Sequence, residues 1–115
     1  MALTRSFKET VKARADRDPA FRVGLLQEAL EAFLDGDLAT GKVLLRDYVN
    51  ATGGFEELGS HLHKSPKSLM RMLSEEGNPR ADNLFALVAH LKTAEGVSLS
   101  VTSKPARQGQ THQRC

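Results

Sequence analysis

The sequence predicts one all-α domain of five helices, followed by a short C-terminal β-strand. Apolar residues recur at helical spacing in five successive stretches, and capping residues, glycine or proline separate each stretch from the next. A chain of 115 residues has room for one domain with its own core, but not for two. Near the C-terminus the apolar period changes to two residues, which is typical of a strand.

Composition excludes several classes of protein. Cys115 is the one cysteine, so no disulfide can form within the chain, and a reducing compartment is expected. No apolar stretch approaches the ~18 residues that a bilayer crossing requires, and the N-terminus lacks an apolar signal segment. We therefore expect a soluble, cytoplasmic protein that does not associate with membranes.

The formal charge of +2 conceals an uneven distribution of charge along the chain. Basic side chains predominate in an N-terminal segment, residues 1–17, and in a polar tail, residues 103–115. The tail lacks periodicity and is expected to be disordered. Residues 18–38 carry five acidic side chains and one arginine. Between the two basic ends, the domain itself is predicted over residues 18–102.

The first two predicted helices have clear start and stop signals. The first begins at Asp18 and Pro19, which favour the N-cap and the first helical position, and ends at Gly36. Its apolar stripe comprises Phe21, Leu25, Leu26, Ala29, Leu30, Phe33 and Leu34. The second has Asp37 as its N-cap and stops at Gly53. Its inward side comprises Leu38, Leu44, Leu45, Tyr48 and Val49.

Two short helices are predicted next, over residues 55–63 and 66–74. Ser65 and Pro66 are the N-cap and first position of the second one, which ends near Gly77. Their apolar stripes comprise Phe55, Leu58 and Leu62 in the first helix and Leu69, Met72 and Leu73 in the second. Two short helices joined by two or three residues are the outline of a helix-turn-helix unit.

Burying the apolar stripe of the second short helix leaves a polar, cationic face outward, because successive helical residues turn by about 100°. Lys67, Arg71 and Ser74 lie at the centre of that face, and Ser68 and Met70 flank it. Arginine can contact guanine with two hydrogen bonds, lysine and hydroxyl groups can reach bases or phosphates, and methionine can meet a thymine methyl group. These five residues are candidate DNA contacts.

Four further residues are candidate DNA contacts. Ser65 stands at the N-terminus of the second short helix, where free N–H groups favour a phosphate. Gly54 lets the backbone at the start of the first short helix approach DNA closely. Asn78 and Arg80 lie in a loop that can reach the sugar-phosphate backbone.

A fifth helix and the strand complete the predicted domain. Asp82 is expected to cap the helix and Gly96 to end it. The inward residues of this helix are Leu84, Phe85, Leu87, Val88 and Leu91. Over residues 97–101 apolar and polar residues alternate, as in a strand. A lone strand leaves its backbone groups unpaired, so this one requires a partner.

The run over residues 53–74, followed by Gly77-Asn78-Pro79 and residues 82–86, resembles the addiction-module antidote proteins. These are HigA-like antitoxins of type II toxin–antitoxin operons with a lambda-repressor-like helix-turn-helix. The resemblance spans residues 3–101 and is strongest over residues 53–91. It implies a bacterial regulator that neutralises a RelE-like or HigB-like ribonuclease toxin and represses its own operon.

One position departs from the pattern of that family. The turn of the helix-turn-helix commonly has glycine where this chain has His63. A non-glycine residue at positive φ costs up to ~1–2 kcal/mol. Histidine tolerates this region of backbone conformation better than most residues do, so the turn is still expected.

Several partners fit these predictions. Helix-turn-helix proteins usually read two half-sites of operator DNA as dimers, so a homodimer is expected. Residues 97–101 can pair with the same strand of a second copy, with a strand of the toxin, or with residues 3–7 of this chain. The acidic helix that starts at Asp18 can instead dock on a basic toxin, or its outer face is simply solvated.

No catalytic residue, metal site or cofactor is predicted. His61 and His63 would point about 200° apart on a helix and so cannot chelate one metal ion, and His90 and His112 add no ligand spacing. No phosphate-binding loop or activated nucleophile is recognisable, so an enzyme is not expected. Two alternatives to the antitoxin remain. One is a stand-alone helix-turn-helix transcriptional regulator, and the other is a protein-interaction module with a vestigial helix-turn-helix.

Overall fold

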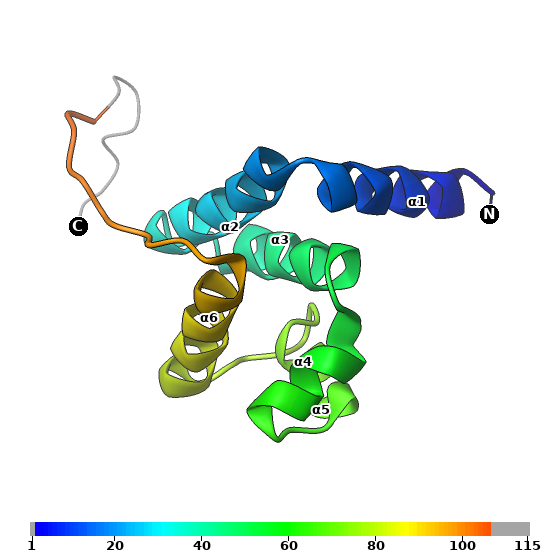
Figure 1. Cartoon of the computed structure of the whole chain (residues 1–115). Coiled ribbons are helices and arrows are strands. Elements are labelled where there is room, and N and C mark those ends of the chain that lie inside the picture. Colours follow the sequence, from blue (N-terminus) through cyan, green and yellow to red (C-terminus); the bar gives the residue numbers. More distant parts are fainter. Residues whose placement is uncertain (1, 107–115) are drawn as a thin grey trace.

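The computed structural model describes the backbone of residues 2–106 and the side chains of residues 9–106. The described chain forms a compact all-α domain, which confirms the predicted class. Its six helices are α1 (Ala2–Arg17), α2 (Pro19–Leu34), α3 (Leu38–Ala51), α4 (Gly54–Leu62), α5 (Pro66–Met72) and α6 (Ala81–Glu95). In Figure 1, α2 packs along α3, α1 extends away from this pair, and α4, α5 and α6 lie on the other side of α3.

The two predicted N-caps of α2 and α3 form the expected hydrogen bonds. The Asp18 carboxylate accepts hydrogen bonds from the backbone N–H groups of Ala20 and Phe21, at 3.1 and 3.3 Å. The Asp37 carboxylate accepts from the backbone N–H of Thr40 at 3.2 Å and from its hydroxyl at 2.7 Å. These bonds, the hydroxyl first, hold the pKa of the Asp37 carboxyl below its usual value. Local sequence therefore sets where α2 and α3 begin.

The predicted cap of the last helix was wrong. Arg80, not Asp82, occupies the N-cap of α6, and no side chain caps the helix there. Asp82 lies in the first turn, where its carboxylate accepts a hydrogen bond from the backbone N–H of Asn83 at 2.8 Å. It also lies 3.4 Å from the Arg80 guanidinium. An acidic residue in the first turn still stabilises the helix through the helix dipole.

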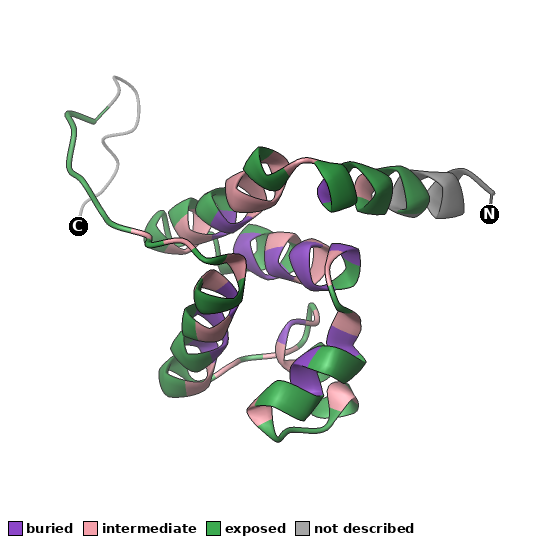
Figure 2. Ribbon diagram, viewed as in Figure 1, coloured by how far each residue is buried: buried purple, intermediate pink, exposed green. Residues whose placement is uncertain are grey.

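The core lies where α2 and α3 meet α4, α5 and α6 (Figure 2). The largest fully buried side chains are Leu26, Leu45, Leu69, Leu73, Leu87 and Val49. All six come from the stripes that the sequence predicts to face inward. Hydrophobic burial at these positions is the main driving force that gathers the helices.

Three residues predicted to face inward are instead exposed. Leu34 and Leu38 are 69% and 40% exposed because they flank the tight turn between α2 and α3, which no other element covers. Phe85 is 63% exposed. It follows Leu84 and so lies about 100° around the α6 helix from the buried stripe.

The N-terminal segment is helical, which the sequence analysis did not predict. An apolar residue recurs every four positions in α1, and the last of them, Ala15, is fully buried. Exposed ion pairs support the helix one turn apart, between Lys12 and Asp16 at 3.5 Å and between Arg14 and Asp18 at 3.4 Å. The Arg14 guanidinium also lies 4.9 Å from the centre of the Phe21 ring, which joins α1 to α2.

The C-terminal strand is not formed in the described part of the chain, where residues 97–106 have no regular secondary structure. Residues 3–7, one proposed strand partner, lie within α1 and so cannot pair with residues 97–101 as a strand. Val97 and Leu99 are half-buried and Ser98 and Ser100 exposed, but Val101 is 78% exposed, so the predicted alternation persists only as far as Ser100. A strand here would need a second chain. The tail that was expected to be disordered, residues 103–115, lies only partly within the described residues, because residues 107–115 fall outside them.

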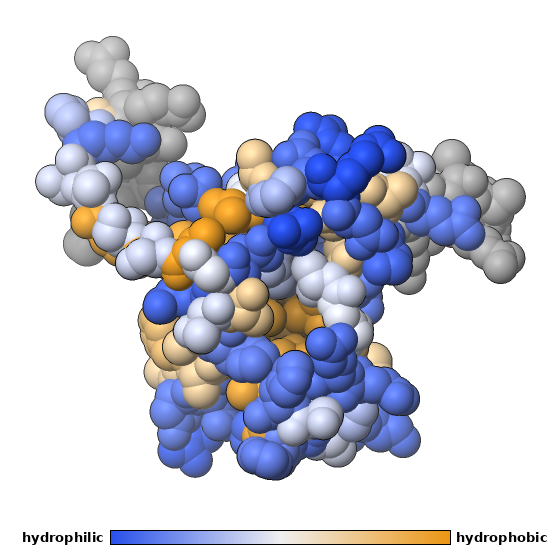
Figure 3. Space-filling view, viewed as in Figure 1, coloured by the Kyte–Doolittle hydropathy of each residue, from blue (hydrophilic) through white to orange (hydrophobic). Residues whose placement is uncertain are grey.

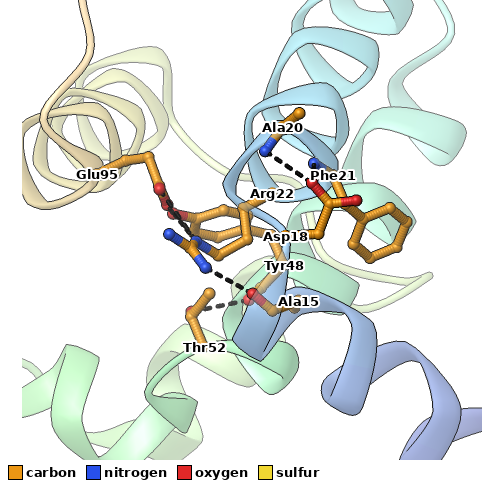
Figure 4. Close-up of polar contacts among 8 residues, drawn as sticks. All are labelled: Ala15, Asp18, Ala20, Phe21, Arg22, Tyr48, Thr52 and Glu95. Atoms are coloured by element: carbon orange, nitrogen blue, oxygen red, sulfur yellow. Dashed lines mark hydrogen bonds and ion pairs between the residues drawn. The ribbon is translucent and has the colours of Figure 1, made fainter.

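A polar network ties four helices together at the end of the domain distant from α5 (Figure 4). Arg22 of α2 donates from Nε to both carboxylate oxygens of Glu95 in α6, at 3.1 and 3.0 Å, and from Nη1 to the Ala15 carbonyl of α1. The Tyr48 hydroxyl of α3 donates to the same carboxylate. Burial, with the adjoining Glu95 carboxylate, raises the pKa of Tyr48. The buried carboxylate is thus fully paired, as a buried charge requires.

Within the described residues, no helix has the length and hydropathy that crossing a lipid bilayer requires.

Candidate nucleic-acid interface

Helices α4 and α5 are joined by the three residues 63–65, as the predicted helix-turn-helix requires. The turn is made by His63, whose φ of 58° and ψ of 42° place it in the left-handed region. It is the one non-glycine residue at positive φ in the described chain. The histidine therefore adopts the conformation that glycine usually supplies at this position.

Gly59 makes the tight turn possible, and the sequence analysis did not identify it. The backbone N–H of Lys64 donates to the Gly59 carbonyl at 3.0 Å, so the turn folds back onto α4. A Cβ atom at residue 59 would lie 2.5 Å from the Lys64 carbonyl oxygen, which is closer than real Cβ atoms approach. Only glycine leaves room for this contact. The signal was a glycine inside a predicted helix, which often has a packing reason.

Helix α5 begins at the predicted cap and ends earlier than predicted. The Ser65 hydroxyl accepts a hydrogen bond from the backbone N–H of Ser68 at 3.1 Å. The helix stops at Met72, two residues before the predicted end, so Ser74 lies beyond the helix rather than on its outward face. The half-buried Ser74 donates its hydroxyl to the Arg71 carbonyl at 2.7 Å. It closes the helix end.

A buried lysine of α3 fixes the segment that follows α5. Lys42 is 5% exposed, which is rare for a lysine. Its ammonium donates to the backbone carbonyls of Ser74, Glu75 and Gly77, at 2.8, 3.4 and 2.7 Å. The Glu75 and Gly77 carbonyls are therefore satisfied from α3, and the Ser74 carbonyl, which also accepts from the Gly77 backbone N–H at 3.1 Å, gains a second donor. The sequence held a signal for this, because Lys42 lies one turn before the buried Leu45 on the inward side of its helix.

Two further contacts hold the same segment. Arg46, one turn after Lys42, donates from Nη1 to the Leu73 carbonyl at 3.1 Å. The loop then packs so closely on α5 that a Cβ atom at Gly77 would lie 2.1 Å from the Arg71 carbonyl oxygen. These contacts orient the inner side of α5 against α3 and leave its outer side uncovered.

Seven of the nine candidate DNA contacts line one open depression along α5 and the loop that follows it. They are Lys67, Ser68, Met70, Arg71, Ser74, Asn78 and Arg80. All except Ser74 are exposed, and Met70 is 45% exposed, which is high for a large apolar side chain. The fold thus brings together the residues of the predicted outward face and those of the loop.

Ser65 and Gly54 do not join this group. Ser65 is exposed at the start of α5, where its hydroxyl serves as the helix cap. Gly54, at a φ of +83°, lines a different depression between α3, α4 and α6. The sharp turn from α3 into α4 requires a positive φ at residue 54, and this explains the glycine there. The geometry therefore gives no support to the prediction that Gly54 approaches DNA closely.

Three residues that the sequence analysis missed also line the depression along α5. Lys64 and Asn83 add a cation and an amide, and Glu76 adds an acidic group. With Lys67, Arg71 and Arg80, four cationic side chains face one carboxylate there. The local charge is clearly positive although the charge of the whole chain is small. Lys64 was not predicted as a DNA contact because it lies in the turn and not on the outward face of a predicted helix.

Comparison of the chain with protein-family models, with curated proteins and with solved structures found no match.

Lys42→Met is expected to lower the free energy of unfolding by about 1–3 kcal/mol, because it leaves part-buried carbonyl groups without a donor. Chemical denaturation followed by circular dichroism measures the loss. Lys12→Met, which removes an exposed lysine of α1, is the matched control and should change stability by less than ~0.5 kcal/mol. Equal effects of the two substitutions would contradict the role of Lys42.

His63→Val is expected to lower the free energy of unfolding by about 1–2 kcal/mol, because a β-branched residue is strained in the left-handed region. His63→Gly should be neutral or mildly stabilising, since relief of strain offsets the greater freedom of the unfolded chain. Denaturation of both variants tests the turn. If valine were tolerated as well as glycine, residue 63 would not adopt positive φ.

Proposed function

We propose that the chain is a sequence-specific DNA-binding regulator whose helix α5 enters the major groove. The observation that carries this proposal is the division of α5 into two sides. Leu69 and the adjoining Leu73 are fully buried, while Lys67, Ser68, Met70 and Arg71 are exposed beside Arg80. A solvated outer side is commonly charged as well, but here the cations surround an exposed Met70, which together offer the hydrogen-bond donors and the apolar contact that base edges require.

The dimensions of α5 support this role. Seven helical residues span about 10 Å, which compares with the ~12 Å width of the major groove. Arg71 lies one turn after Lys67, so the two side chains project from the same side of the helix. We assign Arg71 to a base edge and Lys67, nearer the helix start, to a phosphate.

The antitoxin role is the more specific part of the proposal, and the resemblance of residues 53–91 to addiction-module antidote proteins supports it. Such a protein would neutralise a basic ribonuclease toxin and repress its own operon as a homodimer. Glu28, Glu31, Asp35 and Asp37 are exposed on and after α2, which provides an acidic surface away from α5. Residues 97–101 are the segment available for pairing with a second copy or with the toxin's sheet.

A stand-alone transcriptional regulator is the alternative that the cationic side of α5 supports equally well. Co-expression with the product of the adjacent open reading frame distinguishes the two. An antitoxin should co-purify with that product and relieve its toxicity to the cell. If the two proteins do not associate, the stand-alone regulator replaces the antitoxin.

Binding to DNA from upstream of the protein's own gene tests the regulator directly. Arg71→Ala is expected to cost about 1–3 kcal/mol and to relax preference at one base pair, because it removes a contact to a base edge. Lys67→Ala should weaken binding to all sequences alike and reduce the salt slope by about 1, because it removes a phosphate contact. Fluorescence anisotropy at several salt concentrations measures both effects.

Lys12→Ala is the control for these variants, because it removes one positive charge from α1, distant from α5 in the fold (Figure 1). It should leave affinity and salt slope nearly unchanged. Wild-type protein that binds its own upstream DNA no more tightly than unrelated DNA would eliminate sequence-specific regulation. The interaction module with a vestigial helix-turn-helix would then be the better account.

A further inference from the structure

Two histidines that are far apart in the sequence meet in the fold. His61 of α4 and His90 of α6 have ring centres 5.2 Å apart, with ring planes inclined at 45°. His61 is exposed and His90 half-buried, and both line a cavity of about 390 Å³ between α3, α4 and α6. Figure 3 shows the hollow between the upper and lower parts of the molecule. The pair is therefore accessible to small ions.

The separation of the two rings matches shared coordination of a metal ion. A zinc ion lies 2.0–2.1 Å from an imidazole nitrogen, and hence about 3.2 Å from the ring centre. Two imidazoles at the tetrahedral angle then have centres about 5.2 Å apart. Nitrogen ligands on neighbouring helices are a common way to build a metal site in a helical domain.

The charges that line the cavity also favour a cation. Arg22 and Glu95 neutralise each other through their ion pair at 3.0 Å. Asp16 and Glu57 line the same cavity, and the ion-pair partner of Asp16 among the described residues, Lys12, is exposed. Glu57 lies one turn before His61 on α4. A cation between the histidines would therefore lie in a region with excess negative charge.

We propose that His61 and His90 form an interhelical site for Zn²⁺ or another transition ion that prefers imidazole. No group of three or more potential ligands is found among the described residues, so water completes the coordination. A site of this kind joins α4, the first helix of the helix-turn-helix, to α6. The bound ion thus reinforces the packing of Leu58 and Leu91, which lie on the same two helices.

This proposal departs from the sequence prediction of no metal site, which considered each histidine with its neighbours along the chain. His61 and His63 do not form it together, because His63 lies in the turn with a left-handed backbone. The fold supplies His90 instead. The proposal is independent of DNA binding, since the pair lies in a different depression from Lys67 and Arg71.

The thermal stability of the full chain, measured with and without Zn²⁺, tests the site. His112→Ala and Cys115→Ser are introduced throughout, so that possible ligands in the tail do not contribute. The melting temperature of this parent should rise with Zn²⁺ concentration, because an ion that binds the folded state stabilises it. His61→Ala and His90→Ala should each abolish most of the rise and weaken Zn²⁺ binding at least about tenfold.

His63→Asn is the matched control, because it removes a nearby histidine while asparagine tolerates the left-handed turn. It should keep the full rise in melting temperature. If His90→Ala fails to fold, His90→Gln replaces it.

Broadening of NMR signals by Cu²⁺ locates the ion without any substitution, and residues 61 and 90 should lose intensity first. Equal Zn²⁺ effects in parent and histidine variants, no effect up to about 1 mM Zn²⁺, or broadening confined to other residues would overturn the proposal.

Discussion

The position of α5 depends on one buried lysine. A helix of seven residues is far below the ~12–15 residues that an isolated helix needs to persist in water, so tertiary contacts must hold it. Burial of Leu69 and Leu73 fixes one side, and the Lys42 ammonium pairs carbonyl groups of the loop that follows the helix. Since these contacts come from α3 and the core, none of them occupies the outer side of α5. The cationic side chains are therefore free for a partner.

At the opposite end of the domain, the Glu95 carboxylate also joins separate helices through hydrogen bonds. The Glu95 carboxylate collects hydrogen bonds from Arg22 and Tyr48, and Arg22 also reaches the Ala15 carbonyl, so α1, α2, α3 and α6 share one network. Between the two anchors the helices pack mainly through leucine and valine side chains, whose interlocking also favours particular crossing angles. The polar contacts that pair buried groups lie at the ends of the domain. The contacts of Lys42 hold α5 so that its outer side faces solvent.

How far the sequence determines this structure differs from feature to feature. Helix starts at Asp18, Asp37 and Ser65 were predictable because a cap bonds to residues two or three positions away. The turn at His63 was expected from the resemblance, and its backbone conformation agrees. The outward side of α5 was predictable from helical periodicity up to Met72, but not beyond, because the helix end depends on contacts with α3.

The features that sequence reasoning missed depend on contacts between distant segments. Lys42 falls on the inward side of α3, but its carbonyl partners are known only once the loop after α5 is placed beside it, and His61 and His90 become neighbours only when α4 meets α6. Residues 97–101 have the alternating sequence of a strand but form none in the described chain, since a strand depends on a partner.

The central claim, that the outer side of α5 contacts DNA, is tested most directly by NMR titration of the isotope-labelled protein with a duplex from upstream of its gene. The account predicts that the largest changes in amide chemical shift fall on residues 64–80, with little change in α1 and α2. Changes confined to α2 or to residues 97–106, or no change with excess duplex, would contradict it.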